Sequence, residues 1–436
     1  MSRRARPATL LPIRQPQEAR TMRRSLPEKG IHFKVLEREL MAARADDLPW
    51  DRGTFYTYWP DPGDNTALVA KEAMALMGQQ RVISRKGNPS ALRIERDVQD
   101  MVLGIFQAPD GAACTLTAGG TESNYLAVLA AREWARAARP GLGRPNIILG
   151  RASHPSFDKA GHALDVEIVR IDEGPDGRLD PAKVAATIDG RTIMLVGNAP
   201  SFPLGRIDAL DQFAALAARH NLWFHVDACV GGFLIPFLRR AGIKGQAVDF
   251  TVPGVRSISA DLHKYGLTPT GLSTLTVRDA RDQDHHRFVF TDWPAGEYAT
   301  PSFAGSRNAS TIAAAWAVMR NLGLAGYVAK AKAVAAQAEA LARGIEQIPG
   351  LRLLNESEAG ILVYTSDELD VPAIGDGMTE RGFPSRWLKG PIAIHLMISP
   401  NGDLETVATY LDVLAEVTQA VRAGTVKRRT EKQVYA

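Results

Sequence analysis

The chain has 436 residues, of which 45% are apolar and 23% are charged, as is usual for a globular protein. Its 52 basic and 48 acidic residues leave a formal charge of +4, which is too small to indicate a nucleic-acid partner. Its two cysteines, Cys114 and Cys229, exclude a disulfide framework and metal-ligand spacing, so we expect a cytoplasmic protein with neither a transmembrane anchor nor a secretory signal.

Residues 1–60 are expected to form an N-terminal arm with a short helix around Phe33–Ala45 and an aromatic cluster at Phe55–Trp59. The arginines among the first two dozen residues are typical of a solvated tail. A basic transit peptide is the alternative, although three prolines in this stretch would interrupt its amphipathic helix.

From about residue 90 to 320, helical patterns alternate with short β-branched runs. Amphipathic helices are predicted over Leu92–Phe106 and Ser123–Ala137, and strands over Asn146–Leu149, Val166–Arg170 and Thr192–Val196. Nearly continuous apolar strands that alternate with helices are typical of a parallel sheet covered on both faces. We therefore predict a large α/β domain over residues 61–325.

Beyond residue 325 the pattern changes to one long helix, a few strands and a closing helix. These predicted elements are Gly326–Ile348, Leu351–Leu354, Ile361–Tyr364, Ile392–Met397 and Leu404–Ala423. They indicate a small C-terminal α+β domain over residues 326–436.

The segment Ser257-Ile-Ser-Ala-Asp-Leu-His-Lys-Tyr-Gly266 places Lys264 in a turn rich in small residues, downstream of a predicted strand that ends in Asp227. A lysine that forms a Schiff base with an aldehyde must be held close and partly desolvated. A carboxylate at the end of a strand suits the ring nitrogen of pyridoxal phosphate. Together Lys264 and Asp227 indicate a pyridoxal-phosphate enzyme.

A second segment, Leu116-Thr-Ala-Gly-Gly-Thr-Glu-Ser-Asn124, stands directly before a predicted helix. Glycines allow close backbone approach, and hydroxyls beside the free N–H groups of a helix N-terminus suit a phosphate. It is neither a Walker loop nor a dinucleotide fingerprint, and alone such a turn would more often be a simple helix cap.

His154 and Asp227 each have an ordinary structural interpretation as well. A single histidine is more often structural, but His154 follows the strand near Gly150 and is a candidate to stack on a flat cofactor. Asp227 could be a helix cap or part of a salt bridge. A buried carboxylate without a partner costs several kcal/mol, however, and a pyridinium nitrogen would supply that partner.

Three segments, Thr117–Asn124, His225–Gly232 and Ser257–Gly266, resemble the group II pyridoxal-phosphate-dependent decarboxylase family, and within it most closely the sphingosine-1-phosphate lyase branch. Phe157–Ala160 and Ala304–Arg307 resemble it too. The resemblance runs from about residue 28 to the C-terminus. It implies the fold-type I architecture, with a mostly parallel seven-stranded sheet, and a homodimer with active sites shared between subunits.

The resemblance also implies a role for each matching residue. Lys264 would hold the cofactor as a Schiff base, Asp227 would meet the ring nitrogen and His154 would stack on the ring. The cofactor phosphate would be held by Gly120, Thr121 and His263, and by Gly305 and Ser306 of the partner subunit. Asn88 would lie near the substrate, and Tyr56 or Tyr58 would stand at its entrance.

This chain departs from the lyase pattern in the part that would contact the substrate. Where the lyases carry a second lysine six residues after the first, this chain has Thr270, and the histidine beyond Asn88-Pro89 is missing. Arg93 is a candidate replacement as a phosphate ligand. Ala199 also stands where a hydroxyl residue is expected near the cofactor.

The function expected from these observations is a carbon–carbon lyase that cleaves a β-hydroxy amine, similar to sphingosine 1-phosphate, into an aldehyde and an amine. The alternative is an L-amino-acid decarboxylase on the same scaffold, which would release CO2 instead. A third possibility is a cofactor-binding protein that has lost turnover, but the presence of Lys264, Asp227 and His154 argues against it.

Overall fold

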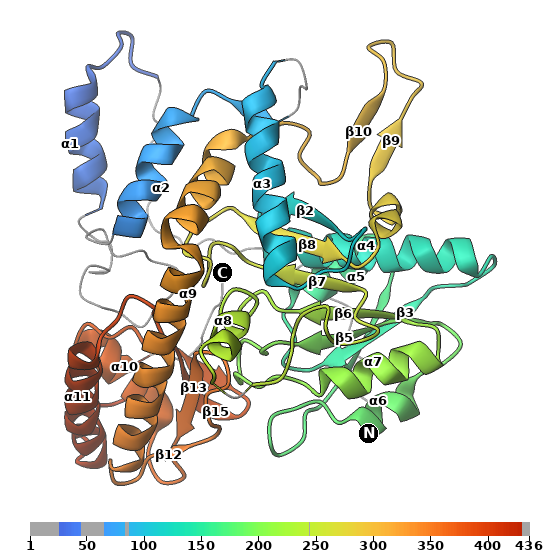
Figure 1. Cartoon of the computed structure of the whole chain (residues 1–436). Coiled ribbons are helices and arrows are strands. Elements are labelled where there is room, and N and C mark those ends of the chain that lie inside the picture. Colours follow the sequence, from blue (N-terminus) through green and yellow to red (C-terminus); the bar gives the residue numbers. More distant parts are fainter. Residues whose placement is uncertain (1–25, 45–64, 83–86, 244, 430–436) are drawn as a thin grey trace.

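A large α/β domain and a smaller α+β domain share one long helix, α9 (Figure 1). The computed structural model describes residues 26–44, 65–82, 87–243 and 245–429. Tyr56, Tyr58 and most of the predicted N-terminal arm lie outside these ranges.

The large domain is built on a seven-stranded sheet with the strand order β2-β8-β7-β6-β5-β3-β4. Among these seven strands only β8 runs antiparallel to its neighbours, which confirms the predicted mostly parallel sheet. The strands are β2 (Ala113–Thr117), β3 (Asn146–Gly150), β4 (Glu167–Ile171), β5 (Thr192–Asn198), β6 (Trp223–Asp227), β7 (Ser257–Ala260) and β8 (Ser273–Val277).

Helices cover both faces of this sheet, because successive side chains of a strand point to opposite sides. In β3, Ile147 and Leu149 belong to one apolar cluster with α4 and α5, while Ile148 belongs to the other with α3, α7 and α8. The helices of this domain are α3 (Pro89–Ile105), α4 (Gly120–Ala138), α5 (Ser156–Leu164), α6 (Pro181–Thr187), α7 (Leu210–Arg219) and α8 (Ile235–Arg240), with a 3-10 helix at Ala280–His285.

Several short elements lie outside the main sheet. A hairpin of two strands projects from the large domain at the upper right of Figure 1. The elements are α1 (Phe33–Ala43), α2 (Asn65–Leu76), β1 (Arg81–Val82), β9 (Phe288–Phe290), β10 (Tyr298–Thr300) and β11 (Arg307–Asn308).

The small domain is a four-stranded antiparallel sheet of order β12-β13-β15-β14, packed against α9, α10 and α11. The elements are α9 (Ala309–Glu346), β12 (Arg352–Leu353), β13 (Ile361–Thr365), α10 (Val371–Glu380), β14 (Trp387–Lys389), β15 (Ile392–Met397) and α11 (Leu404–Arg422).

Helix α9 serves both domains, and the predicted boundary at residues 325/326 falls inside it. That position comes just after Gly323, whose φ of 55° interrupts the helical path. By length and composition α9 is the one described helix that could cross a membrane. It packs against α2, α3, α8 and α11, as a core helix of a globular protein does.

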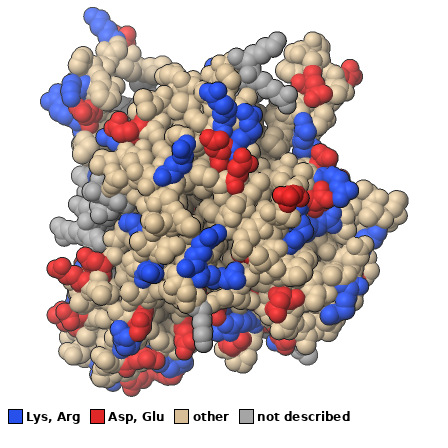
Figure 2. Space-filling model, in the orientation of Figure 1, with Lys and Arg blue, Asp and Glu red and all other residues tan. Residues whose placement is uncertain are grey.

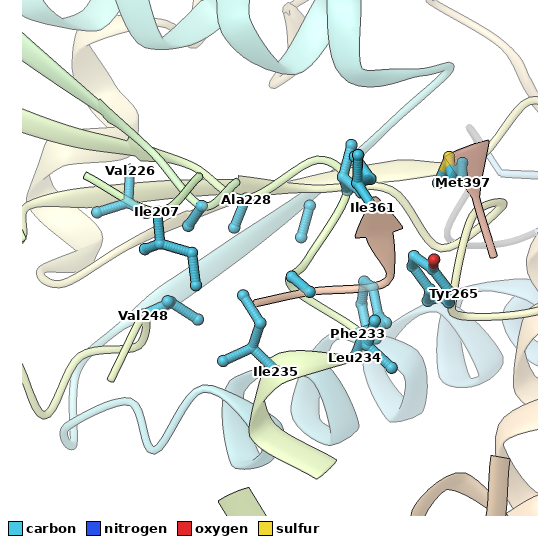
Figure 3. Close-up of a cluster of buried hydrophobic side chains, with 14 of the residues drawn as sticks. Ile207, Val226, Ala228, Phe233, Leu234, Ile235, Val248, Tyr265, Ile361 and Met397 are labelled. Atoms are coloured by element: carbon cyan, nitrogen blue, oxygen red, sulfur yellow. The ribbon is translucent and has the colours of Figure 1, made fainter. Parts of the chain in front are cut away.

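The two domains meet in an apolar cluster that includes Tyr265, the residue after Lys264 (Figure 3). Phe233 and Leu234 come from the large domain and Ile361 and Met397 from the small one. The Tyr265 hydroxyl lies 2.9 Å from the carbonyl oxygen of Ile398 and 3.2 Å from that of Gly360. The lysine turn is therefore anchored to the small domain by its next residue.

Positive and negative side chains are interspersed over the face of the molecule that Figure 2 presents. This mixed surface agrees with the nearly balanced composition of 52 basic and 48 acidic residues. The face shown offers no broad single-sign surface of the kind that attracts a polyanion.

Candidate active site

A cavity of about 830 Å³ opens where strands β5, β6 and β7 and the turn before α4 meet, and we call it the cofactor cavity. The carboxyl ends of neighbouring parallel strands lie at one edge of a sheet, which is where ligands of open α/β sheets bind. Six residues singled out from the sequence line it: Gly120, Thr121, His154, Asp227, His263 and Lys264.

Lys264 lies in the turn after β7, and its amine is 3.0 Å from Oδ2 of Asp261. Asp261 is only 3% exposed, so burial alone would raise the pKa of its carboxyl group. The charges of Lys264 and His263 outweigh that effect and hold the pKa below its ordinary value. Asp261 is therefore an anionic partner that keeps the amine of Lys264 in the cavity.

Asp227 ends β6 with its carboxylate buried but hydrogen-bonded. One oxygen accepts from Nδ2 of Asn124 at 3.1 Å, and the other accepts from the backbone N–H of Cys229 at 3.1 Å and from the Ser259 hydroxyl at 3.4 Å. These are neutral donors, so they fix the carboxylate in place without neutralising it. The negative charge stays available to a cation in the cavity.

His154 is held in a defined tautomer. The backbone N–H of Ser156 donates to Nδ1 of its ring at 3.2 Å, so in the neutral ring the proton sits on Nε2. Burial lowers the pKa of His154 below its ordinary value, and the nearby Asp227 charge only partly opposes this shift. A neutral, flat ring is suited to stack on an aromatic cofactor.

The turn before α4 forms a cradle at the other end of the cofactor cavity. A Cβ at Gly120 would lie 2.7 Å from Sγ of Cys229 and 2.8 Å from Oδ1 of Asp261, so only glycine fits there. Nδ1 of His263 donates to the carbonyl oxygen of Leu272 at 2.8 Å, which fixes the ring beside the turn. Free N–H groups of a helix start and a neighbouring histidine make a suitable phosphate site.

These groups fit pyridoxal phosphate. An amine for the aldehyde, a carboxylate for the ring nitrogen, a flat ring for stacking and a phosphate cradle all line one cavity. Lys264, Asp227, His154 and the turn at Gly120 would each hold one part of that molecule.

Other residues singled out from the sequence do not line the cofactor cavity of this single chain. Thr270 and Arg93 are exposed, and Asn88 stands at the start of α3. Ala304 does line the cavity, directly before Gly305 and Ser306, and Glu122 accepts hydrogen bonds from the backbone N–H groups of Ala118 and Phe303. The expectation that Gly305 and Ser306 serve the partner subunit stays a prediction.

Sequence reasoning gave no role to several polar residues that line the cavity, among them Asn124, Lys159, Asn198 and Asp261. Asp261 and Asn124 lie in the segments Ser257–Gly266 and Leu116–Asn124, each three positions from a predicted ligand. A polar side chain so close to a predicted ligand could have identified both. Asn198 ends β5 and donates from Nδ2 to Oδ2 of Asp208 at 2.8 Å. Its position is set by the folded chain, so spacing alone did not reveal it.

Comparison with known proteins agrees with this geometry. The pyridoxal-dependent decarboxylase conserved domain matches residues 43–366. A sphingosine-1-phosphate lyase of Oryza sativa is 32% identical over 92% of this chain and 75% of its own length. The structure of a Burkholderia pseudomallei sphingosine-1-phosphate lyase, 35% identical, superposes with a TM-score of 0.86 and covers 92% of this chain and 93% of that one.

A relative of the other functional type is also similar. A probable L-tyrosine/L-aspartate decarboxylase of Methanothermobacter thermautotrophicus is 31% identical over 73% of this chain and 86% of its own length.

Proposed function

The chain belongs to the pyridoxal-dependent decarboxylase family, and we propose that it is a carbon–carbon lyase for a phosphorylated β-hydroxy amine of the sphingosine 1-phosphate type. Its products are an aldehyde and a phosphorylated amine. The observation that carries this proposal is the likeness to sphingosine-1-phosphate lyases over nearly the whole chain, together with a cavity that joins Lys264, Asp227 and His154.

The cofactor of this family, pyridoxal phosphate, supplies an electron sink for the carbon that bears the substrate nitrogen. The residues of the chain set up that sink. The Asp227 carboxylate would hold the ring nitrogen and favour its protonated form, and His154 would stack on the ring. Asp261 holds the Lys264 amine within the cavity, where it is placed to give and take a proton.

The cleavage itself is a retro-aldol step. A base takes the proton of the substrate β-hydroxyl, the Cα–Cβ bond breaks, and its electron pair passes to Cα while the β-carbon leaves as an aldehyde. A proton is then returned to Cα, and the Lys264 amine, which Asp261 holds in the cofactor cavity, would supply it. Tyr56 and Tyr58 remain the proposed entrance residues, although both lie outside the described residues.

The active form proposed here is a cytoplasmic homodimer. Phe303 and Ala304 line the cofactor cavity and are exposed, and Gly305 and Ser306 follow them directly along the chain. An exposed segment of this kind is suited to complete the phosphate cradle of a second subunit.

The second candidate is an L-amino-acid decarboxylase. The archaeal relative and the presence of Thr270 in place of a lysine favour it. In that reaction the carboxylate of the substrate leaves as CO2, and the aldehyde is not formed.

A substrate panel tests the proposal. Purified holoenzyme is given phosphorylated β-hydroxy amines and common L-amino acids, and aldehyde and CO2 are measured in parallel. We expect aldehyde from the phosphorylated amines. Release of CO2 from an amino acid, without aldehyde from the amines, would establish the decarboxylase instead.

A further inference from the structure

Strands β6 and β7 carry a row of buried polar side chains that leads to Asp227. The two strands are parallel neighbours, with His225 opposite Ser257 and Asp227 opposite Ser259. Alternate residues of a strand point to the same side, so these four side chains share one face of the sheet. His225 and both serines are fully buried, and Asp227 is only 4% exposed. A buried polar group costs free energy unless it is hydrogen-bonded, so the partners of each decide what the row can do.

Hydrogen bonds join the row into a chain. The indole N–H of Trp223 donates to Oγ of Ser257 at 2.7 Å, and this oxygen lies 2.8 Å from Nδ1 of His225. On the other side of the ring, Nε2 lies 3.2 Å from Oγ of Ser259. The Ser259 hydroxyl in turn donates to Oδ1 of Asp227 at 3.4 Å. The chain therefore ends at the carboxylate that would hold the ring nitrogen of the cofactor.

The donors and acceptors of this chain fit one direction. An indole nitrogen can only donate, so Ser257 accepts from Trp223 and keeps its own proton for another acceptor. Among the described residues the Ser257 side chain has no hydrogen-bond partner besides Trp223 and His225, so that proton goes to Nδ1. A neutral His225 ring then carries its proton on Nε2 and donates it to Ser259, whose hydroxyl proton is left for Asp227.

The opposite tautomer of His225 would leave groups of the chain without partners. With the ring proton on Nδ1, the Ser257 hydroxyl would have no acceptor, and Ser259 would have to donate to Nε2 instead of to Asp227. A buried donor or acceptor left unpaired is costly. Burial also lowers the pKa of His225 to about 4, so the ring is neutral at physiological pH. The ring of Phe157 packs against it with the centroids 6.0 Å apart.

We propose that His225 is a positioning residue for the cofactor and acts through Ser259 and Asp227. Its Nε2–H holds the Ser259 oxygen so that the hydroxyl proton points to Asp227, which fixes the orientation of the carboxylate. Without that ring the hydroxyl can turn away, and Asp227 loses one of its three neutral donors. The inference goes beyond the proposed function, because the lyase and the decarboxylase reactions both use the cofactor ring as an electron sink.

The tautomer of His225 tests the first step of the inference without any turnover. Holoenzyme with ¹⁵N-labelled histidine is studied by NMR at pH 7, and the signal that is missing from His225→Gln identifies the ring. We expect a neutral ring that is protonated on Nε2. A ring protonated on Nδ1 would overturn the donor chain.

The variant Ser259→Ala tests the second step, since it removes the hydroxyl between His225 and Asp227. The dissociation constant of the cofactor is expected to rise about tenfold and kcat to fall about tenfold, because one hydrogen bond to a charged group is lost, while KM changes little. His225→Phe should resemble Ser259→Ala. His225→Gln should retain most of the wild-type affinity and kcat, because its side-chain amide can still donate to Ser259.

Two controls separate positioning from stability. His286 is also buried, with Nε2 3.3 Å from the Thr115 hydroxyl, but it does not line the cofactor cavity. His286→Phe is expected to lower the free energy of unfolding as His225→Phe does, with cofactor affinity and kcat unchanged. If the chain acts through Asp227, adding Ser259→Ala to Asp227→Asn should lower kcat by clearly less than tenfold.

Three further results would overturn the inference. These are wild-type cofactor affinity and kcat in Ser259→Ala, equal losses in His225→Phe and His286→Phe, and a full tenfold loss of kcat on top of Asp227→Asn. Ser259→Ala and the NMR spectrum decide the matter if His225→Phe does not fold. If no substrate of the panel is turned over, the proposed function fails, whereas the tautomer and the cofactor dissociation constant still test the role of His225.

Discussion

The cofactor cavity and a second cavity of about 640 Å³, which we call the arginine cavity because Arg151, Arg170 and Arg386 line it, share the ring of His154 but are built in opposite ways. In the cofactor cavity, Asp227 and Asp261 are buried and held by hydrogen bonds or an ion pair at the edge of the rigid sheet. In the arginine cavity, the cationic side chains of Arg151, Arg386 and Lys389 are exposed, and the last two belong to the small domain. The first arrangement suits a cofactor that is always the same, whereas the second leaves its charges in contact with solvent.

This difference predicts that changes in the cofactor cavity reduce turnover far more than changes in the arginine cavity do. The largest effect is expected for Lys264→Ala. Removing the amine should abolish turnover and the visible absorbance band of the cofactor bound through it. An unchanged spectrum of the purified variant would refute the assignment of Lys264.

The next largest effect is expected for Asp227→Asn. The amide is nearly the same size and retains hydrogen bonds with its neighbours, but it lacks the charge that keeps the ring nitrogen protonated. Cofactor should remain bound while kcat falls by about two to three orders of magnitude, as for loss of one preorganised electrostatic group. Wild-type kcat in Asp227→Asn, measured at saturating cofactor, would contradict this role.

The variant Tyr265→Phe tests the contact between the lysine turn and the small domain. The variant leaves the carbonyl oxygens of Gly360 and Ile398 without that hydroxyl, at a cost of about 1–3 kcal/mol in the free energy of unfolding. A matched control is Tyr410→Phe, which removes a buried hydroxyl 2.8 Å from that of Tyr364.

Both tyrosine variants are expected to unfold at lower urea concentration. Only Tyr265→Phe should also reduce kcat/KM, because Tyr265, unlike Tyr410, joins the lysine turn to the small domain. Equal kcat/KM in the two variants would show that the domain contact does not affect the site.

The smallest expected effect is a dependence of the free energy of unfolding on pH, to which a buried histidine at each cavity contributes. Burial lowers the pKa of His225, on β6 of the cofactor site, and of His395, in the arginine cavity, to about 4 each. The unfolded chain binds more protons than the folded one between pH 4 and 6.5, so stability is complete above pH 6.5 and falls as the pH drops toward 4.

Each of these histidines should cost roughly 1 kcal/mol of unfolding free energy at pH 5.5. Burial raises the pKa of Asp208 to about 6, and its effect runs the other way and offsets part of the loss. Urea unfolding at several pH values measures the combined effect of these groups on the free energy of unfolding. His395→Asn should flatten the dependence, whereas the control His162→Asn, on an exposed side chain, should leave it unchanged.

The sequence predicted the cofactor cavity far better than the arginine cavity, and the reason is local geometry. Gly120 starts a helix, Asp227 ends a strand and Lys264 lies in the turn after a strand, so alternating β and α patterns place all three at one sheet edge. The mostly parallel sheet followed from the same patterns and is confirmed.

Arg386 and Arg151 are more than two hundred residues apart and belong to different domains. Nothing in their neighbours along the chain indicates that they face one cavity, because their proximity depends on how the small domain docks through Tyr265. The first part of α9, from Ala309, was also missed, since the predicted helix begins at Gly326, just after Gly323 interrupts the helical path.

The central claim is that this chain breaks a carbon–carbon bond rather than releasing CO2. The most direct measurement is the product ratio from a phosphorylated β-hydroxy amine incubated with the wild-type holoenzyme, followed by mass spectrometry. The account predicts aldehyde and phosphorylated amine in equal amounts, with neither formed by Lys264→Ala. CO2 from an L-amino acid as the sole product, with the phosphorylated amine left intact, would contradict it.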